Sequence, residues 1–168
     1  RTLEKDFVTC AVDYLSGSLF AISLPKYTHI ILNPPYKKIH SNSIYRRSIK
    51  KIGFESVNLY SIFLSLSIAL AAKNGQIVAI VPRSFCNGPY YRSFREYLLS
   101  KVAIKQIHLF KSRKHAFRDD DVLQENIILH LEKQAAQGEV ILSTSTDDRF
   151  CDYRDTRIPF AEIIHPGD

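Results

Sequence analysis

The stretch that decides the fold is Tyr27-Thr28-His29-Ile30-Ile31-Leu32, which is followed directly by Asn33-Pro34-Pro35-Tyr36. Its first half is short, β-branched and apolar, as expected of a buried strand. The two prolines lack the amide hydrogen that a strand ladder needs, so they end the strand at once. The segment therefore predicts a buried β-strand that stops in a rigid loop.

Apolar residues recur after this loop at helical and then at strand spacing. Residues 58–73 carry them at helical spacing and end at Asn74-Gly75, which predicts a helix, and residues 89–100 fit an amphipathic helix. Short apolar runs predict further strands at residues 76–81, 104–110, 126–131 and 140–143. Strands and helices that alternate in this way predict an α/β fold with right-handed crossovers and a largely parallel sheet.

Two segments show no regular pattern. Residues 37–51 are rich in lysine and arginine, which indicates an exposed loop with one helical turn. Residues 144–168 are charged and irregular, as expected of a segment that leaves the domain. The sequence therefore predicts one core over residues 1–143 and an exit segment after it.

The composition limits the class of protein. The chain has 168 residues, 45% of them hydrophobic, and a net charge of +6, which suits a polyanionic partner but is also common in ordinary domains. Three cysteines without a C-x-x-C pair argue against a disulfide framework, and neither they nor the scattered histidines suggest a metal site. These features favour a reducing, cytoplasmic setting. The most apolar stretch, residues 57–72, is too short and too rich in serine to favour a membrane partner.

The tetrapeptide Asn33-Pro34-Pro35-Tyr36 carries two hydrogen-bond acceptors and an aromatic ring, which are the groups needed to hold and activate the exocyclic amine of a base. In open α/β sheets, ligands bind outside the carboxyl ends of the strands, where this loop must lie. Asn33 Oδ1 and the Pro34 carbonyl are two acceptors that could hold the hydrogens of an exocyclic adenine amine and draw its nitrogen toward an attacking geometry. The base would have to be flipped out of a duplex, and Tyr36 would replace its lost stacking. The alternative is a tight turn in which Tyr36 only covers the core.

From residue 27 to about residue 133 the chain resembles the γ-type DNA adenine-N6 methyltransferases of bacterial restriction–modification systems. The residues that carry the resemblance are Ile31 to Tyr36, Asn58 to Tyr60 with Phe63, Gly75 to Pro82, and Phe117 with Val122 to Ile128. The resemblance implies a partial Rossmann-like fold of the S-adenosylmethionine-dependent methyltransferases, with the later strands of the sheet present and the first strands missing. It also implies transfer of a methyl group from S-adenosylmethionine to N6 of a flipped adenine in double-stranded DNA by the intact parent protein.

The resemblance also implies roles for individual residues. The tetrapeptide matches the catalytic motif, and Phe117 matches an aromatic residue that packs with Tyr36 against the flipped base. Residues expected near the adenine of the cofactor are Asp6, Phe7 and Phe63, of which Phe63 fits a plain core position equally well. Basic residues that either contact the DNA backbone or form a solvated loop are Lys37, Lys38, Arg46, Arg47, Lys50 and Lys51.

Parts of the family pattern are absent from the sequence. No G-x-G turn occurs, the chain contains no Met, and its first residue is Arg1. We therefore expect residues 1–143 to be the C-terminal part of a catalytic domain and residues 144–168 to lead to a missing target-recognition domain. Such a fragment should be inactive alone, and its truncated sheet edge could mediate self-association.

Two other interpretations stay open. The same tetrapeptide would suit a methyltransferase that acts on a glutamine amide in a protein or on a guanine amine in RNA. A non-catalytic nucleic-acid-binding module that retains the fold as a scaffold is favoured by the missing cofactor motif and disfavoured by the intact tetrapeptide.

Overall fold

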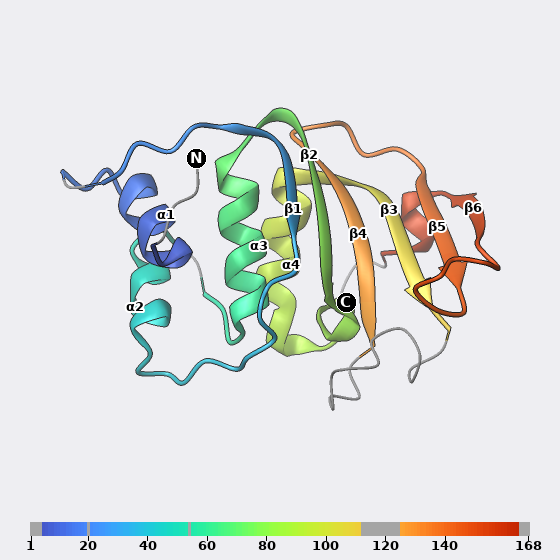
Figure 1. Ribbon diagram of the computed structural model, residues 1–168, viewed down its shortest axis with the longest axis horizontal. Helices are drawn as coiled ribbons and strands as arrows, with labels where there is room; N and C mark the ends of the chain where they lie inside the picture. Colours follow the sequence, from blue (N-terminus) through green and yellow to red (C-terminus); the bar gives the residue numbers. More distant parts are fainter. Residues whose placement is uncertain (1–4, 20, 54, 112–124, 165–168) are drawn as a thin grey trace.

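A computed structural model (Figure 1) contains one six-stranded sheet with the order β1-β2-β4-β3-β5-β6. It describes residues 5–19, 21–53, 55–111 and 125–164. The strands are β1 (Tyr27–Leu32), β2 (Ala71–Pro82), β3 (Val102–Phe110), β4 (Asn126–Lys133), β5 (Val140–Ser145) and β6 (Arg154–Ile158). The predicted α/β class is confirmed, and the strands predicted after the tetrapeptide are all present.

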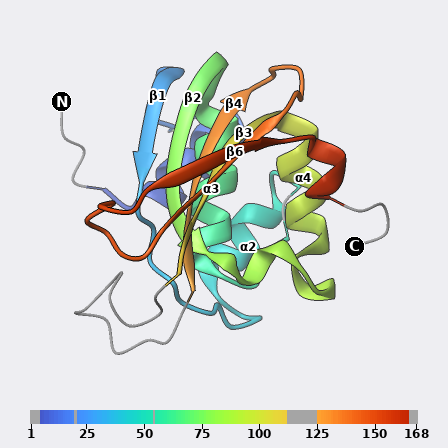
Figure 2. The same ribbon diagram turned by 90° about the vertical axis from the view of Figure 1, so that its right-hand side faces the viewer.

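The helices pack in layers over one face of the sheet, as Figure 2 shows. The α-helices are α1 (Phe7–Leu15), α2 (Ile44–Lys50), α3 (Leu59–Leu70) and α4 (Arg92–Lys101), and the short 3₁₀ helices are η1 (Arg83–Cys86), η2 (Pro89–Tyr91) and η3 (Phe160–Glu162). Both α3 and α4 contact the sheet core, whereas α1 and α2 pack beside α3 in a second apolar cluster. In the described part of the chain, no helix has the length and apolar character needed to cross a membrane.

The core forms where the inward residues of the central strands meet α3 and α4. Ile77, Ala79 and Val81 of β2 alternate with outward residues and are fully buried, as strand periodicity requires. Leu129 and Leu131 of β4 continue the same layer. Apolar burial of this kind contributes about 25 cal/mol per Å², so this layer stabilises the packing of α3 and α4 on the sheet.

The sheet is mixed, so the prediction of a largely parallel sheet was wrong. β1 with β2 and β3 with β5 are parallel pairs, whereas β4 enters between β2 and β3 and runs antiparallel to both. β6 also runs antiparallel to β5. Strand periodicity reports which side chains are buried but carries no information about the direction of a neighbouring strand, which explains the error.

β1 is less buried than its apolar sequence predicts. It lies at the edge of the sheet, and of its residues only Ile30 and Leu32 face the core. Ile31 points to the opposite face and is 86% exposed. The apolar run predicted the strand correctly, but the burial of a strand also depends on what covers its second face and second edge. Self-association through this edge remains a prediction.

Several elements differ in extent from the sequence prediction. α3 ends at Leu70, before the predicted residue 73, because Ala71 is already extended and starts β2. Asn74-Gly75 is instead a bend inside β2, where Asn74 has a φ of 60° and the register with β1 shifts. Residues 144–168 were predicted to be irregular, and this was wrong for β6, which pairs with β5 through its backbone although its side chains are exposed.

We expect Gly75→Ala to destabilise the fold. A Cβ at this position would lie 2.9 Å from the Ala72 carbonyl oxygen and 3.0 Å from that of Tyr27, so the backbone would have to shift. Such overpacking costs about 1–3 kcal/mol. The matched control is Gly138→Ala, since no atom lies within 4 Å of a Cβ there. Urea denaturation compares the two variants, and equal free energies of unfolding would contradict the close approach at Gly75.

Candidate functional site

The tetrapeptide leaves the sheet where β1 stops beside a strand that continues. Leu32, the last residue of β1, pairs with Ala79, and β2 runs on to Pro82. Beyond this point Asn33 and Pro35 are exposed, whereas Pro34 is buried. The acceptors of the loop therefore lie at the carboxyl end of a parallel strand pair, the position where open α/β sheets bind ligands.

Tyr36 turns back from the loop toward the end of β2. Its hydroxyl lies 2.9 Å from Asn33 Oδ1 and 3.2 Å from the Ile80 carbonyl oxygen, so these two acceptors compete for its single hydrogen. Its ring is partly buried and meets Tyr60 edge to face, with ring centroids 6.4 Å apart. The alternative view of Tyr36 as a cover of the core is thus correct in part, but the ring also remains partly exposed beside Asn33.

An aromatic cluster supports Tyr36 from behind. Tyr60 of α3 is 2% exposed and packs against Tyr91 and Phe94, with ring centroids 5.8 Å and 6.4 Å away. Asn58 Nδ2 donates to the Tyr91 hydroxyl and so fixes the start of α3 to this cluster. Burial is the main cause that raises the pKa of Tyr60 far above its usual value, so this hydroxyl stays neutral.

The segment after the tetrapeptide is tied to the start of α3 by backbone hydrogen bonds. The Leu59 amide donates to the Lys37 carbonyl, and the Ile39 amide donates to the Val57 carbonyl, each at 2.9 Å. Lys37 and Lys38 are exposed on this segment. These bonds explain why Asn58 to Tyr60 and the tetrapeptide, distant in sequence, lie together.

The residues expected near the cofactor are brought into one group. Phe7 of α1 and Phe63 of α3 are both partly buried, and their ring centroids are 5.1 Å apart. Asp6 caps α1 by accepting from the Thr9 amide at 2.7 Å, and its second oxygen accepts from the Tyr45 hydroxyl at 2.9 Å. Burial opposes ionisation of Asp6, but the bonds from Thr9 and Tyr45 outweigh it and lower the pKa of the carboxyl.

Sequence patterns missed α1 and Tyr45. Asp6 followed by apolar residues at helical spacing is an N-cap signal that could have revealed α1. Nothing in the sequence pairs Tyr45 with Asp6, because α2 meets α1 only in the folded chain. The hydrogen bond to Asp6 raises the pKa of Tyr45, so both groups keep their ordinary charge near neutral pH.

Other candidate residues lie around the loop or outside the described residues. Phe117 is among the residues that the structure does not describe, so its base-binding role remains a prediction. Arg46 and Arg47 lie on α2, and Lys50 pairs with Glu55 at 3.3 Å. This exposed ion pair gives Lys50 a local partner. DNA contacts by the basic residues remain predictions for Lys37, Lys38, Arg46, Arg47, Lys50 and Lys51.

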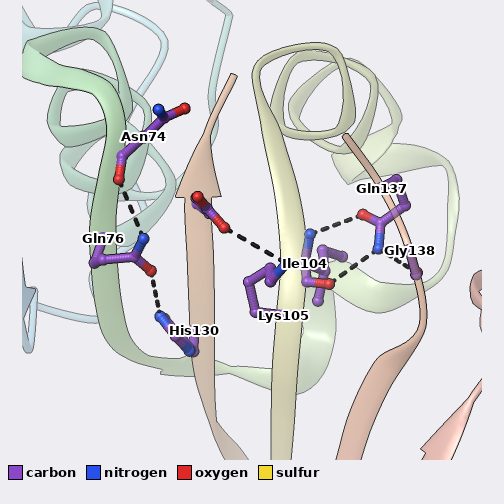
Figure 3. Close-up of polar contacts among 8 residues, drawn as sticks. Asn74, Gln76, Ile104, Lys105, His130, Gln137 and Gly138 are labelled. Carbon is purple, nitrogen blue, oxygen red and sulfur yellow. Dashed lines mark hydrogen bonds and ion pairs between the residues drawn. The ribbon is translucent and has the colours of Figure 1, made fainter. Parts of the chain in front are cut away.

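A separate polar network lies on the sheet face that the helices leave open. Figure 3 shows its end near the start of β2, where His130 Nε2 lies 2.7 Å from Gln76 Oε1 and Lys105 pairs with Glu132 at 3.5 Å. At the other end, buried His108 contacts the hydroxyls of Ser143 at 2.9 Å and Ser145 at 3.0 Å.

The bonds of Ser145 fix the tautomer of His108. Ser145 Oγ donates its single hydrogen to the Asp147 carbonyl, so His108 Nε2 must donate to Ser145 Oγ. Nδ1 is then free to accept from Ser143. In its neutral form His108 thus carries its proton on Nε2, and burial lowers the pKa of its ring, as it does that of His130.

The protein is expected to lose stability as the pH falls. Because the folded-state pKa of His108 and His130 lies below the ordinary 6.5, the unfolded chain binds more protons below that pH. The stabilisation is therefore fully present above pH 6.5 and declines as the pH drops below it. Denaturation at about pH 7.5 and about pH 5.5 measures the slope. His108→Gln should flatten it, and a slope unchanged by His108→Gln would refute this origin.

Comparison with known proteins identifies the family to which the chain belongs. The model of the Eco57I restriction-modification methylase family matches residues 7–117. The Type II methyltransferase M.BsuBI of Bacillus subtilis is 55% identical over 170 residues, which cover 100% of this chain and 34% of that protein. The Type II methyltransferase M.PstI of Providencia stuartii is 43% identical over 165 residues, covering 98% of this chain and 32% of that protein. The chain thus spans about a third of the length of these relatives.

A solved structure supports the fold. A Listeria monocytogenes protein assigned to the class I S-adenosylmethionine-dependent methyltransferases superposes with a TM-score of 0.59 and 14% identity. The match covers 74% of this chain and 38% of that one. At this low identity the likeness concerns the fold alone, and it agrees with the predicted methyltransferase-like sheet.

Proposed function

Since the chain belongs to the Eco57I restriction-modification methylase family, we propose that the full-length protein transfers a methyl group from S-adenosylmethionine to N6 of a flipped adenine in double-stranded DNA. The observation that carries the proposal is the placement of Asn33 and Pro34 at the open carboxyl edge of β1, next to the partly exposed ring of Tyr36. The names of the relatives support DNA modification, and the choice of adenine rests on this loop.

The two acceptors address the poor nucleophilicity of the amine. The lone pair of adenine N6 is delocalised into the ring, and Asn33 Oδ1 and the Pro34 carbonyl would each hold one of its hydrogens. These two hydrogen bonds favour a tetrahedral N6 nitrogen whose lone pair points at the methyl group. Bound S-adenosylmethionine supplies a sulfonium-activated methyl group for in-line displacement. Positioning by fixed acceptors then lowers the barrier without a dedicated base.

The group formed by Asp6, Phe7 and Phe63 fits the adenine end of the cofactor. Two partly exposed aromatic rings offer a stacking surface, and the low pKa of Asp6 keeps an anionic acceptor beside them. Asp6 retains acceptor capacity, since each carboxylate oxygen has more than one lone pair. These residues would hold the cofactor's adenine on the β1 side of the tetrapeptide.

Basic residues near the loop suit the phosphate backbone of DNA. Lys37 and Lys38 follow the tetrapeptide and are exposed, and α2 adds Arg46 and Arg47. Contacts of this kind position DNA without reading its sequence and weaken with salt.

Asn33→Ala should reduce turnover much more than DNA binding. Loss of one fixed acceptor typically lowers turnover about 10²–10³-fold. The measurement is transfer of labelled methyl from S-adenosylmethionine to adenine-containing duplex DNA by the full-length protein, with product digestion to identify N6-methyladenine. Asn74→Gly is the control, because it removes an amide at the opposite end of β2 and suits the positive φ there.

Each other result of this assay has a defined meaning. Near-normal methylation by Asn33→Ala would show that the acceptor role is wrong. Label in protein or RNA instead of DNA would favour a glutamine or guanine substrate. Failure of the wild-type protein to bind the cofactor would favour the non-catalytic module.

Phe63→Ala should weaken cofactor binding. Loss of one stacking ring costs about 1–3 kcal/mol, so the Kd for S-adenosylmethionine should rise about five- to 150-fold. Calorimetric titration of the full-length protein measures it. Phe150→Ala removes another partly exposed ring, on the far face of the sheet, and should leave the Kd unchanged. An unchanged Kd in Phe63→Ala would assign Phe63 to the core only.

A further inference from the structure

We propose that Tyr45 is a positioning residue for the cofactor, because its hydroxyl holds the Asp6 carboxylate in the orientation that accepts from the exocyclic amine of the cofactor's adenine. This inference rests on the function proposed above, in which Asp6 lies beside that adenine. Tyr45 acts through Asp6 and needs no contact of its own with the cofactor.

The chemistry of adenine determines which of its groups Asp6 can hold. The free ring nitrogens of adenine only accept hydrogen bonds, and the exocyclic amine is its donor. Burial opposes ionisation of Asp6, but hydrogen bonds from Thr9 and Tyr45 lower the pKa of its carboxyl, so the group is ionised at neutral pH. An ionised carboxylate has lone pairs and no hydrogen, so the amine is the group of adenine that it can bind.

The hydrogen bond between Tyr45 and Asp6 has one possible direction. The Tyr45 hydroxyl oxygen lies 2.9 Å from Asp6 Oδ2. Because the carboxylate cannot donate, the single hydrogen of the hydroxyl must point at Oδ2. Among the described residues no second acceptor competes for this hydrogen. The bond is therefore a charge-assisted one from Tyr45 to Asp6.

The two contacts of Asp6 together fix the plane of its carboxylate. Asp6 is exposed, and the terminal torsion of an aspartate has a broad energy profile, so one bond alone would leave the group free to turn. Oδ1 accepts from the Thr9 amide of α1 at 2.7 Å, and Oδ2 accepts from Tyr45 of α2. Each oxygen keeps a further lone pair, whose direction is then defined. The carboxylate is thus preorganised to accept from a ligand.

Tyr45 is a fixed donor because its ring is anchored in the helical layer. Helices α1 and α2 lie side by side next to α3 (Figure 1), and the ring of Tyr45 packs against the apolar cluster that these three helices share. Ile49, one turn later on α2, is buried in this cluster. Phe7 and Phe63, the rings proposed to stack on the adenine, pack against the same cluster. The same packing therefore places the hydroxyl and the proposed stacking rings.

The test compares two ligands of the full-length protein. S-adenosylhomocysteine carries the adenosine of the cofactor without the methyl group, and its deamino analogue has hydrogen in place of the exocyclic amine. Calorimetric titration gives the Kd of each ligand in the wild-type protein and in Tyr45→Phe, which keeps the ring and removes the hydroxyl. Tyr14→Phe is the matched control, because the Tyr14 ring packs against the same cluster and its hydroxyl has no hydrogen-bond partner among the described residues.

We expect Tyr45→Phe to raise the Kd of S-adenosylhomocysteine about three- to tenfold, the effect of one hydrogen bond. The Kd of the deamino analogue should rise less than about twofold, because Asp6 then has no amine to hold. Tyr14→Phe should change neither value. An unchanged Kd of S-adenosylhomocysteine in Tyr45→Phe would overturn the proposal. An equal rise for both ligands would overturn it as well, since a purely structural role of the hydroxyl does not distinguish them.

These measurements also separate the proposal from the proposed function. Neither ligand has a methyl group to transfer, so the result does not depend on which substrate the protein methylates. If the full-length protein transfers no methyl to adenine in DNA, the proposed function fails, and the Kd values still decide the role of Tyr45. If adenine is methylated and Tyr45→Phe leaves the Kd unchanged, the positioning role alone fails. A wild-type protein that binds neither ligand would overturn both.

Discussion

Proline cannot donate a hydrogen bond to a strand ladder, and the candidate site depends on this constraint. Pro34 and Pro35 stop β1 at Leu32, while β2 continues to Pro82 beside the vacated position. The chain must therefore leave the sheet next to a strand that is still running. Asn33 becomes exposed, Pro34 is buried, and Tyr36 can reach back to Ile80. If β1 did not end at Leu32, the acceptors of Asn33 and Pro34 and the ring of Tyr36 would not lie at the same edge of the sheet.

The sequence predicted the elements whose side chains alternate between core and surface. α3, β2, β3, β4 and β5 were found within a few residues, because their periodicity directly records burial on one face. The position of β4 between β2 and β3 was not predictable, since direction and order are set by packing of the whole sheet. β6 escaped detection because its exposed, charged side chains carry no burial pattern, and only its backbone pairs with β5.

The location of the candidate loop was predictable from the sequence, and its contacts were less so. The tetrapeptide could be singled out because prolines, an amide and an aromatic ring after a strand form a rare local combination. Phe7 and Phe63 were expected together only through family resemblance, and the structure brings their rings into contact. The contact of Tyr45 with Asp6 and that of Tyr36 with Asn33 depend on side-chain rotamers and on how distant segments pack. Local sequence patterns do not predict either of these.

Tyr60 belongs at once to the core and to the support of the loop. Its ring is enclosed by Tyr91 and Phe94 on one side and meets Tyr36 on the other. Changes that repack α3 against α4 must therefore reach the loop without altering any loop residue. The packing of the two helices and the position of the loop are therefore coupled through one side chain. A substitution that stiffens this cluster against heat would also stiffen the loop that holds Asn33.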